Sequence, residues 1–243
     1  MNFGTYLQIV IIFIICIQSK EQKLNLQTYS TEKYQFYYNS YYDLFNVKVE
    51  CPNLGVLKKF VLKRDNSGFW YEYQCYSSLS ENVDIGEPII KALTLISTHQ
   101  WTYNYINSAI TYLNNYPVDC WADYALNAFV LFFSNGLKRQ TSCKGIKPSF
   151  TSLVNVRTES KQCNINSFDC LFDIKVGSTE QENDVDIGYP LRGFKYVVET
   201  RNNYNYPTVY ILYSYSKLRN MQVVRDSYKQ RFEQLRNSNT QKN

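Results

Sequence analysis

The sequence predicts an all-β protein of three diverged, hairpin-containing repeats in a pseudo-threefold, β-prism-like arrangement, followed by a C-terminal amphipathic helix. Three observations lead to this prediction. Aromatic residues, which are favoured in strands, make up 16% of the chain. A pattern of hydrophobic, acidic and cysteine residues recurs at an offset of 69 residues. From Met221 onward, the apolar residues adopt the spacing of a helix.

Length and composition exclude several classes of protein. The chain has 243 residues, of which 44% are hydrophobic and 19% charged, so it can form one globular domain and is not a disordered chain. No apolar run reaches the roughly 18 residues of a membrane-spanning helix, so we expect no transmembrane segment. The single histidine, His99, excludes a multi-histidine metal centre, and we expect neither a metal nor a cofactor.

The N-terminal segment has the pattern of a secretory signal peptide. Residues 9–17 are all apolar and are followed by Gln18, Ser19 and the charged Lys20. We therefore predict that residues 1–19 are removed and that the protein is secreted, either extracellular or at the cell surface. The alternative is an uncleaved anchor, although nine apolar residues in a helix span only about half of a bilayer core.

The repeat appears when residues 49–51, Val-Glu-Cys, are aligned with residues 118–120, Val-Asp-Cys. Downstream, Leu-x-x-Phe-Val-Leu recurs at 57–62 and 126–131. A third copy aligns at Leu191-Arg192-Gly193-Phe194, which places Asp184 in the acidic position and Val185 where the cysteine stood. These copies divide a domain of residues 20–216 into repeats at about 42–110, 111–180 and 181–216.

The cysteines follow the repeat. Removal of the signal peptide takes Cys16 away and leaves six, and an even number in a secreted chain favours disulfides. The third copy lacks both repeat cysteines. Because the two cysteines occur together in the first two copies and are both missing from the third, they indicate a disulfide inside each of the first two copies. We predict the pairs Cys51–Cys75, Cys120–Cys143 and Cys163–Cys170.

Each copy contains a hairpin pattern. In the first, Asp65-Asn66-Ser67-Gly68 separates alternating segments at 57–63 and 69–75, while the turns of the other copies fall at 134–136 and 202–207. Further strands are predicted at 34–42, 45–49, 153–157 and 171–176. Glu87-Pro88 before a short apolar run instead predicts a helix over 87–96.

The tail, residues 217–243, differs from the rest. Val224, Tyr228, Phe232 and Leu235 recur at steps of three or four, which is typical of an amphipathic helix. The tail has seven Lys or Arg and two acidic residues, so it carries the whole net charge of +5. Two interpretations stay open: the helix docks on an anionic surface, a partner or a lipid headgroup, or its apolar side covers the protein's own β core.

Residues for catalysis are few. His99 has no neighbouring carboxylate, and we interpret it as a surface or hydrogen-bonded residue. Glycosidases need only two carboxylates, but no spacing selects a pair here. Glu50, Asp119 and Asp184 take one place in the three copies, which favours a structural role. The acidic segment 180–186 lacks the order of a calcium loop, so we expect a solvated loop there.

The aromatic surplus indicates a ligand-binding role, since secreted β proteins bind sugars on Trp and Tyr rings that present an apolar face and a polar edge. The alternative for each ring is packing in the core or across strands. Trp70 and Glu72 are opposite in phase to Tyr71 and Tyr73. The candidate ligand-binding residues are Trp70, Glu72, Trp101, Tyr103, Trp121 and Tyr206.

Two short patterns resemble families of secreted β proteins. Residues 125–131, Ala-Leu-Asn-Ala-Phe-Val-Leu, lie between two cysteines and resemble the Ala-Leu-Asn-Gly-Ile repeat of vitelline membrane outer layer proteins. That resemblance implies a threefold β-prism in an extracellular coat. Residues 71–75, Tyr-Glu-Tyr-Gln-Cys, are similar to the loop endings of dermatopontin, which implies an extracellular-matrix protein.

Together these features predict a secreted, disulfide-stabilised, non-enzymatic binding or structural module. Its expected partner is a glycan or an extracellular coat protein. Nucleic acid is not expected, because the chain is exported and the part before the tail has no net charge. The alternative is a secreted hydrolase of the glycosidase kind that uses a carboxylate pair. A third interpretation is a subunit of an extracellular assembly, in contact through the basic tail.

Overall fold

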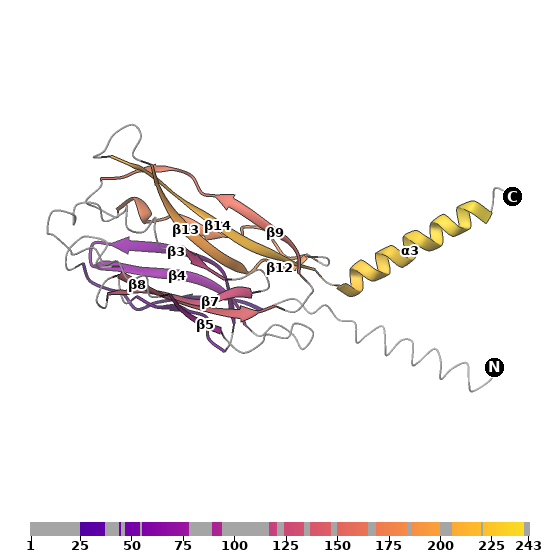
Figure 1. Ribbon diagram of the computed structural model, residues 1–243, viewed down its shortest axis with the longest axis horizontal. Helices are drawn as coiled ribbons and strands as arrows, with labels where there is room; N and C mark the ends of the chain where they lie inside the picture. The colour runs from indigo at the N-terminus through magenta and orange to yellow at the C-terminus, as the bar shows by residue number, and fades with distance from the viewer. Residues whose placement is uncertain are drawn as a thin grey trace.

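The computed structural model describes the chain in segments, and Figure 1 shows that these segments are mainly strands, as predicted. The signal peptide 1–19, His99, Trp101, Tyr103 and Trp121 lie outside the described residues. The described residues are 25–36, 44, 47–53, 55–77, 89–93, 117–120, 124–133, 137–146, 150–164, 169–183, 186–199, 206–219 and 221–240.

The strands form three antiparallel sheets. The first sheet has the order β1 (Asn25–Ser30), β4 (Gly68–Ser77), β3 (Val56–Asp65), β11 (Lys175–Gly177). The second has the order β2 (Val49–Glu50), β7 (Tyr124–Phe133), β8 (Leu137–Gly145), β5 (Ile89–Leu93). The third has the order β10 (Lys161–Gln162), β14 (Thr208–Arg219), β13 (Leu191–Glu199), β6 (Val118–Asp119), and β9 (Phe150–Arg157) and β12 (Asp186–Gly188) also pair with β14.

Each sheet is built on the hairpin of one repeat: β3 with β4, β7 with β8, and β13 with β14. In the first hairpin the predicted turn ends at Gly68, where a Cβ atom would lie 2.1 Å from the backbone oxygen of Tyr34. All three hairpins have a β-bulge at the same place, one residue after the first leucine of the repeat. The pairing of the predicted hairpin strands is confirmed for all three copies, while the predicted turn 134–136 and residues 202–205 of the third turn lie outside the described residues.

Short strands connect each repeat to the sheet of another. β2, which precedes the first hairpin, pairs with β7, and β6, which precedes the second, pairs with β13. β11 precedes the third hairpin and pairs with β3, so the exchange runs through all three sheets. In each case a valine lies opposite the repeat's phenylalanine; the pairs are Val49 with Phe129, Val118 with Phe194 and Val176 with Phe60.

These phenylalanines also meet in the core. The ring centroids of Phe60 and Phe129 are 5.1 Å apart, those of Phe60 and Phe194 4.8 Å, and those of Phe129 and Phe194 5.0 Å. All three rings are buried and belong to the main hydrophobic cluster. One side chain from each sheet therefore lies at the centre of the domain, and the rings meet at interplanar angles of 50–71°, which are favoured over face-to-face stacking.

The third copy departs from the predicted alignment. Val176 and Gly177 occupy the positions of Val49 and Glu50 in the first copy and of Val118 and Asp119 in the second. The residue at the first cysteine position of the third copy is therefore Ser178 rather than Val185. The constant spacing assumed for the sequence alignment missed a longer connection before the third hairpin, residues 178–190, which includes the short strand β12 and is called the loop 178–190 below. Asp184 and Val185 lie outside the described residues.

The three predicted disulfides are confirmed. Cys51 is bonded to Cys75, Cys120 to Cys143, and Cys163 to Cys170. The Cα atoms of the two repeat disulfides are 5.7 and 5.8 Å apart. Leu57 pairs with Cys75 and Leu126 with Cys143, and the equivalent Leu191 pairs with Tyr215, so Tyr215 stands at the second cysteine position of the third copy.

Two predicted elements differ from the structure. The expected helix over 87–96 is wrong, since residues 89–93 form β5 and pair with β8. Its apolar residues extend a sheet, which overrides the weak helix start at Pro88. The strand expected at 171–176 is a 3₁₀ turn, Asp169–Leu171, followed by β11. In the expected strand 34–42, Tyr34 forms an isolated bridge with Phe69, and residues 37–43 lie outside the described residues.

The tail forms the predicted helix, α3 (Met221–Thr240), which extends away from the sheets in Figure 1. Tyr228, Phe232 and Leu235 are 69%, 71% and 58% exposed. The interpretation that these side chains cover the protein's own β core is therefore wrong. No helix in the described ranges is long and apolar enough to cross a membrane.

Candidate functional site

The outer face of the first sheet brings the sequence candidates Trp70 and Glu72 together. In β3, Phe60 and Leu62 point into the core, and Val61 between them points outward because side chains alternate along a strand. In β4, Tyr71 is buried, and its neighbours Trp70 and Glu72 are partly exposed. The exposure of Trp70 and Glu72 agrees with the phase predicted relative to Tyr71, whereas Tyr73 is itself partly exposed.

A groove of about 230 Å³ lies on this outer face. Three of its residues are lysines and one is a carboxylate, Glu72. Burial lowers the pKa of Lys59, and the positive charges of Lys58 and Lys175 lower it further. The groove thus gathers cationic and hydrogen-bonding groups; its lining is Thr28, Lys59, Phe60, Val61, Lys63, Glu72, Tyr73, Gln74 and Lys175.

Trp70 lies beside the groove and is held in position by two neighbours. Its indole Nε1 donates a hydrogen bond to Oε1 of Glu72 at 3.3 Å. The ammonium group of Lys33 lies 5.1 Å from the centre of the ring and forms a cation–π contact. Lys33 itself pairs with Asp65 and donates to Ser67, so the hairpin turn fixes this lysine over the ring.

The other two sheets have grooves at equivalent places. A groove of about 520 Å³ includes Glu50, Ala128 and Gln140, and one of about 450 Å³ includes Asp119, Gly193 and Leu212. By strand register, Glu50 and Asp119 correspond to Gly177 of the first sheet. Ala128 and Gly193 correspond to Lys59, and Gln140 and Leu212 correspond to Glu72. Among the described residues, each of the three grooves has one carboxylate in its lining, whereas glycosidases need two that converge on the substrate.

The bulge of each hairpin carries a buried polar residue that contacts another repeat. Asn127 donates from Nδ2 to the carbonyl oxygens of Cys51 and Gly55, at 3.2 and 2.6 Å. Arg192 donates from Nη2 to the carbonyl oxygen of Cys120 at 3.0 Å. In the first hairpin the equivalent residue is Lys58, so three different side chains satisfy backbone oxygens at one structural position.

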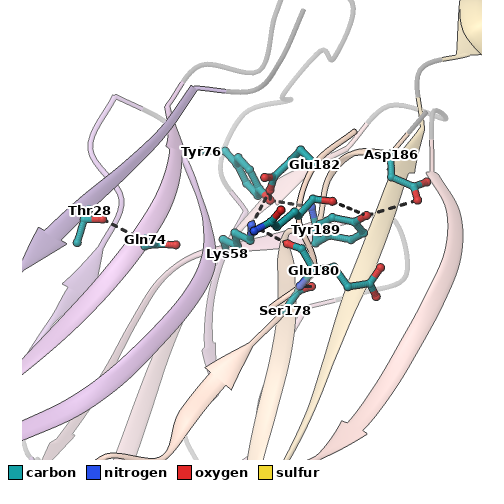
Figure 2. Close-up of polar contacts among 10 residues, drawn as sticks. Thr28, Lys58, Gln74, Tyr76, Ser178, Glu180, Glu182, Asp186 and Tyr189 are labelled. Carbon is teal, nitrogen blue, oxygen red and sulfur yellow. Dashed lines mark hydrogen bonds and ion pairs between the residues drawn. The ribbon is translucent and has the colours of Figure 1, made fainter. Parts of the chain in front are cut away.

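Lys58 is the centre of a polar cluster, shown in Figure 2, that joins the first sheet to the loop 178–190. Its side chain is 6% exposed; Nζ lies 2.6 Å from Oε1 of Glu182 and donates to the carbonyl oxygen of Glu180 at 3.0 Å. Tyr76 donates to Glu182 at 2.5 Å and accepts from the backbone N–H of Tyr189 at 2.9 Å. This cluster anchors the longer loop, so the solvated loop expected at 180–186 is wrong for Glu182, whose side chain is 18% exposed.

Glu180 and Glu182 of this loop are each paired with a lysine. Burial favours the neutral form of Glu182, but hydrogen bonds from Lys58 and Tyr76 outweigh it and lower its pKa. Hydrogen bonds from Lys217 and Tyr215 lower the pKa of Glu180. A general acid needs a raised pKa, so the electrostatics of these two carboxyl groups suit a structural role.

The other candidates from the sequence are not among the described residues that line the groove of the first sheet. Tyr206 is 54% exposed and precedes β14. The positions of Trp101, Tyr103 and Trp121 lie outside the described residues. Sequence reasoning missed Lys59, Lys63 and Lys175 in the groove of the first sheet. Lys59 and Lys63 could have been found from the alternation along 57–63, but Lys175 joins them only through the pairing of β11 with β3.

Within the described segments, no group of three or more His, Cys, Asp or Glu residues is placed to hold a metal ion. No protein-family model matches this chain, and the searches found neither a curated protein nor a solved structure similar to it. Fold and site together define a disulfide-stabilised, mainly β protein with polar grooves on its sheets.

Proposed function

We propose that this protein is a secreted module that binds acidic carbohydrate on the outer face of its first sheet. Its three disulfides are compatible with an oxidising, extracellular environment. The cyclic exchange of β2, β6 and β11 and the three central phenylalanines support a pseudo-threefold, β-prism-like arrangement. The resemblance to vitelline membrane outer layer proteins agrees with this proposal and stays a prediction.

The observation that carries the proposal is the groove beside Trp70. Sugar recognition combines an apolar ring with a few directed polar groups, and this face provides an indole together with lysine, amide, hydroxyl and carboxylate groups. Gln74 and Thr28 form a 3.2 Å hydrogen bond from Nε2 to Oγ1 at the groove, so their polar atoms are preorganised. Preorganised groups lose less entropy on binding.

The charge of the groove favours an acidic ligand. Of the described residues that line it, Lys59, Lys63 and Lys175 are cations and Glu72 is the one anion. Lys63 is partly neutralised by Asp173, whose carboxylate is 2.6 Å away. Lys59 and Lys175 are close enough for Lys175 to lower the pKa of Lys59. A carboxylate or sulfate on a sugar bound between these lysines would relieve their repulsion.

The test is a glycan array probed with the protein released by a secreting host. Acidic glycans should bind, and Trp70→Ala or a Lys59→Gln/Lys175→Gln double variant should weaken binding by about tenfold, the effect of losing one to two good contacts. Leu153→Ala removes an apolar side chain of intermediate size that is 43% exposed on the third sheet and serves as the control. A chain ending at Arg219 separates this binding from charge attraction by α3.

Each outcome decides between interpretations. Binding that survives removal of α3 and falls with the Trp70 variant supports the proposal. Binding that disappears with α3 alone, or that the Trp70 and lysine variants leave unchanged, overturns it. Absence of glycan binding in every form would favour a structural subunit of an extracellular assembly. The alternative hydrolase would require a second carboxylate to converge on Glu72, Glu50 or Asp119.

A further inference from the structure

Helix α3 presents an apolar stripe to solvent. With 3.6 residues per turn, Val224, Tyr228, Phe232 and Leu235 fall within about 40° of the direction of Tyr228. Tyr228 and Phe232 are 69% and 71% exposed. The helix follows β14 directly, and near its start Lys217 is 2.8 Å from Glu180 and Arg219 is 3.4 Å from Asp186.

The charged residues of α3 are sorted around this stripe. Arg225, Arg236 and Lys229 lie about 60 to 100° from its centre on one side, and Arg231 lies about 60° from it on the other. The two acidic residues, Asp226 and Glu233, lie about 140 to 160° away, on the opposite side of the helix. Cations therefore border the apolar stripe, and anions are farthest from it.

We propose that α3 lies on the surface of an anionic lipid bilayer, with Tyr228 and Phe232 in the headgroup region. A helix in that orientation buries its apolar stripe at the boundary of headgroups and acyl chains. The bordering Lys and Arg side chains reach the lipid phosphates, while the acidic residues face water. This function adds to carbohydrate binding, because it uses a separate element and a different ligand.

The pattern of α3 disfavours a second copy of the helix as the partner. A coiled coil would use positions 221, 224, 228, 231 and 235 as its apolar seam. Arg231 occupies the fourth of these positions. A charged residue in the middle of so short a seam is costly, whereas at a bilayer surface the same residue can reach a headgroup.

The test is co-sedimentation of the full secreted protein with vesicles of phosphatidylcholine alone or mixed with phosphatidylserine. Binding should require phosphatidylserine and weaken as salt is raised. Tyr228→Ser/Phe232→Ser should reduce the partition coefficient by about tenfold or more. Arg225→Gln/Lys229→Gln/Arg231→Gln should reduce it by roughly fivefold for each cation removed.

The matched control is Gln230→Ser/Gln234→Ser, which makes two serine substitutions away from the stripe and should bind like the parent. All forms share the same N-terminal segment and glycan face, so differences between them belong to α3. Loss of binding in the cation variant with no effect of Tyr228→Ser/Phe232→Ser would indicate general attraction to polyanions and overturn the proposal. Dimerisation through α3 without vesicles, measured by sedimentation, would also overturn it.

Discussion

Phe60, Phe129 and Phe194 show how one residue type at one repeat position can organise the molecule. Each follows a β-bulge by two residues, and this spacing turns its ring toward the centre. The neighbouring residues Val61, Val130 and Lys195 point outward and line the grooves. The same alternation therefore makes both the core and the candidate binding surfaces.

Replacing one of these rings should be costly. Phe60→Ala leaves a cavity where three sheets meet, and we expect the free energy of unfolding to fall by about 3–5 kcal/mol in denaturant titrations. Val61→Ala, the adjacent residue on the outer face, is the control, with an expected loss of about 1 kcal/mol or less. A similar decrease in the free energy of unfolding for both variants would show that packing among the three phenylalanine rings contributes no special stability.

At the scale of elements, the loop 178–190 replaces part of what the first two repeats obtain from disulfides. Ser178 and Tyr215 stand at the cysteine positions of the third copy, and a hydrogen bond from the Tyr215 phenol to Glu180 ties the loop to β14. Burial raises the pKa of Tyr215 to about 12, so this phenol stays a donor at physiological pH. Polar contacts therefore hold the repeat that lacks its own covalent link.

Those contacts make the free energy of unfolding depend on pH in the acidic range. The pKa values of Glu180 and Glu182 are lower in the folded protein than their ordinary value of 4.5. Their contribution is therefore complete above about pH 4.5 and is lost as the pH falls through the folded pKa values. We expect the melting temperature to fall over this range, and Glu182→Gln to lower it at pH 7 while flattening its pH dependence.

The matched control is Glu159→Gln, which neutralises an exposed carboxyl group on the loop after β9. It should leave both the melting temperature and its pH dependence unchanged, as measured by circular dichroism from neutral to acid pH. Equal behaviour of the two variants would contradict a stabilising role for the Lys58 cluster.

At the scale of the whole molecule, the repeats are linked by exchange of short strands. β2, β6 and β11 each precede one hairpin and pair with the sheet of another, so each sheet contains a strand from a different repeat. A hairpin alone is only marginally stable in water. Exchange of this kind, with the shared phenylalanine core, joins the three sheets into one domain.

Whether Ser178 and Tyr215 are equivalent to the repeat cysteines can be tested by introducing a disulfide between their positions. Ser178→Cys/Tyr215→Cys places cysteines where the other repeats have Cα atoms 5.7 and 5.8 Å apart, a distance suited to a disulfide. We expect the new pair to oxidise, so that thiol titration in denaturant detects no more free thiol than in the parent. Ser178→Cys alone should add one thiol, and two added thiols in the double variant would contradict the structural alignment.

Much of this architecture could be predicted from the chain because it depends on local pattern. Alternation around Phe60, the turn at 65–68 and the apolar spacing in α3 are short-range features whose periods differ between strands and helices. Co-occurrence of cysteines in the first two repeats, and their joint absence in the third, was enough to predict all three disulfides.

What tertiary structure decided involves residues far apart in the chain. The pairing of β11 with β3, the loop 178–190, the strand at 89–93 and the groove formed by Lys175 with Lys59 all depend on contacts between separate repeats. Local propensity misleads in such cases, because burial and strand pairing outweigh it. The orientation of α3 was also decided at this level: its sequence determines an amphipathic helix, but only the fold shows that its apolar stripe faces solvent.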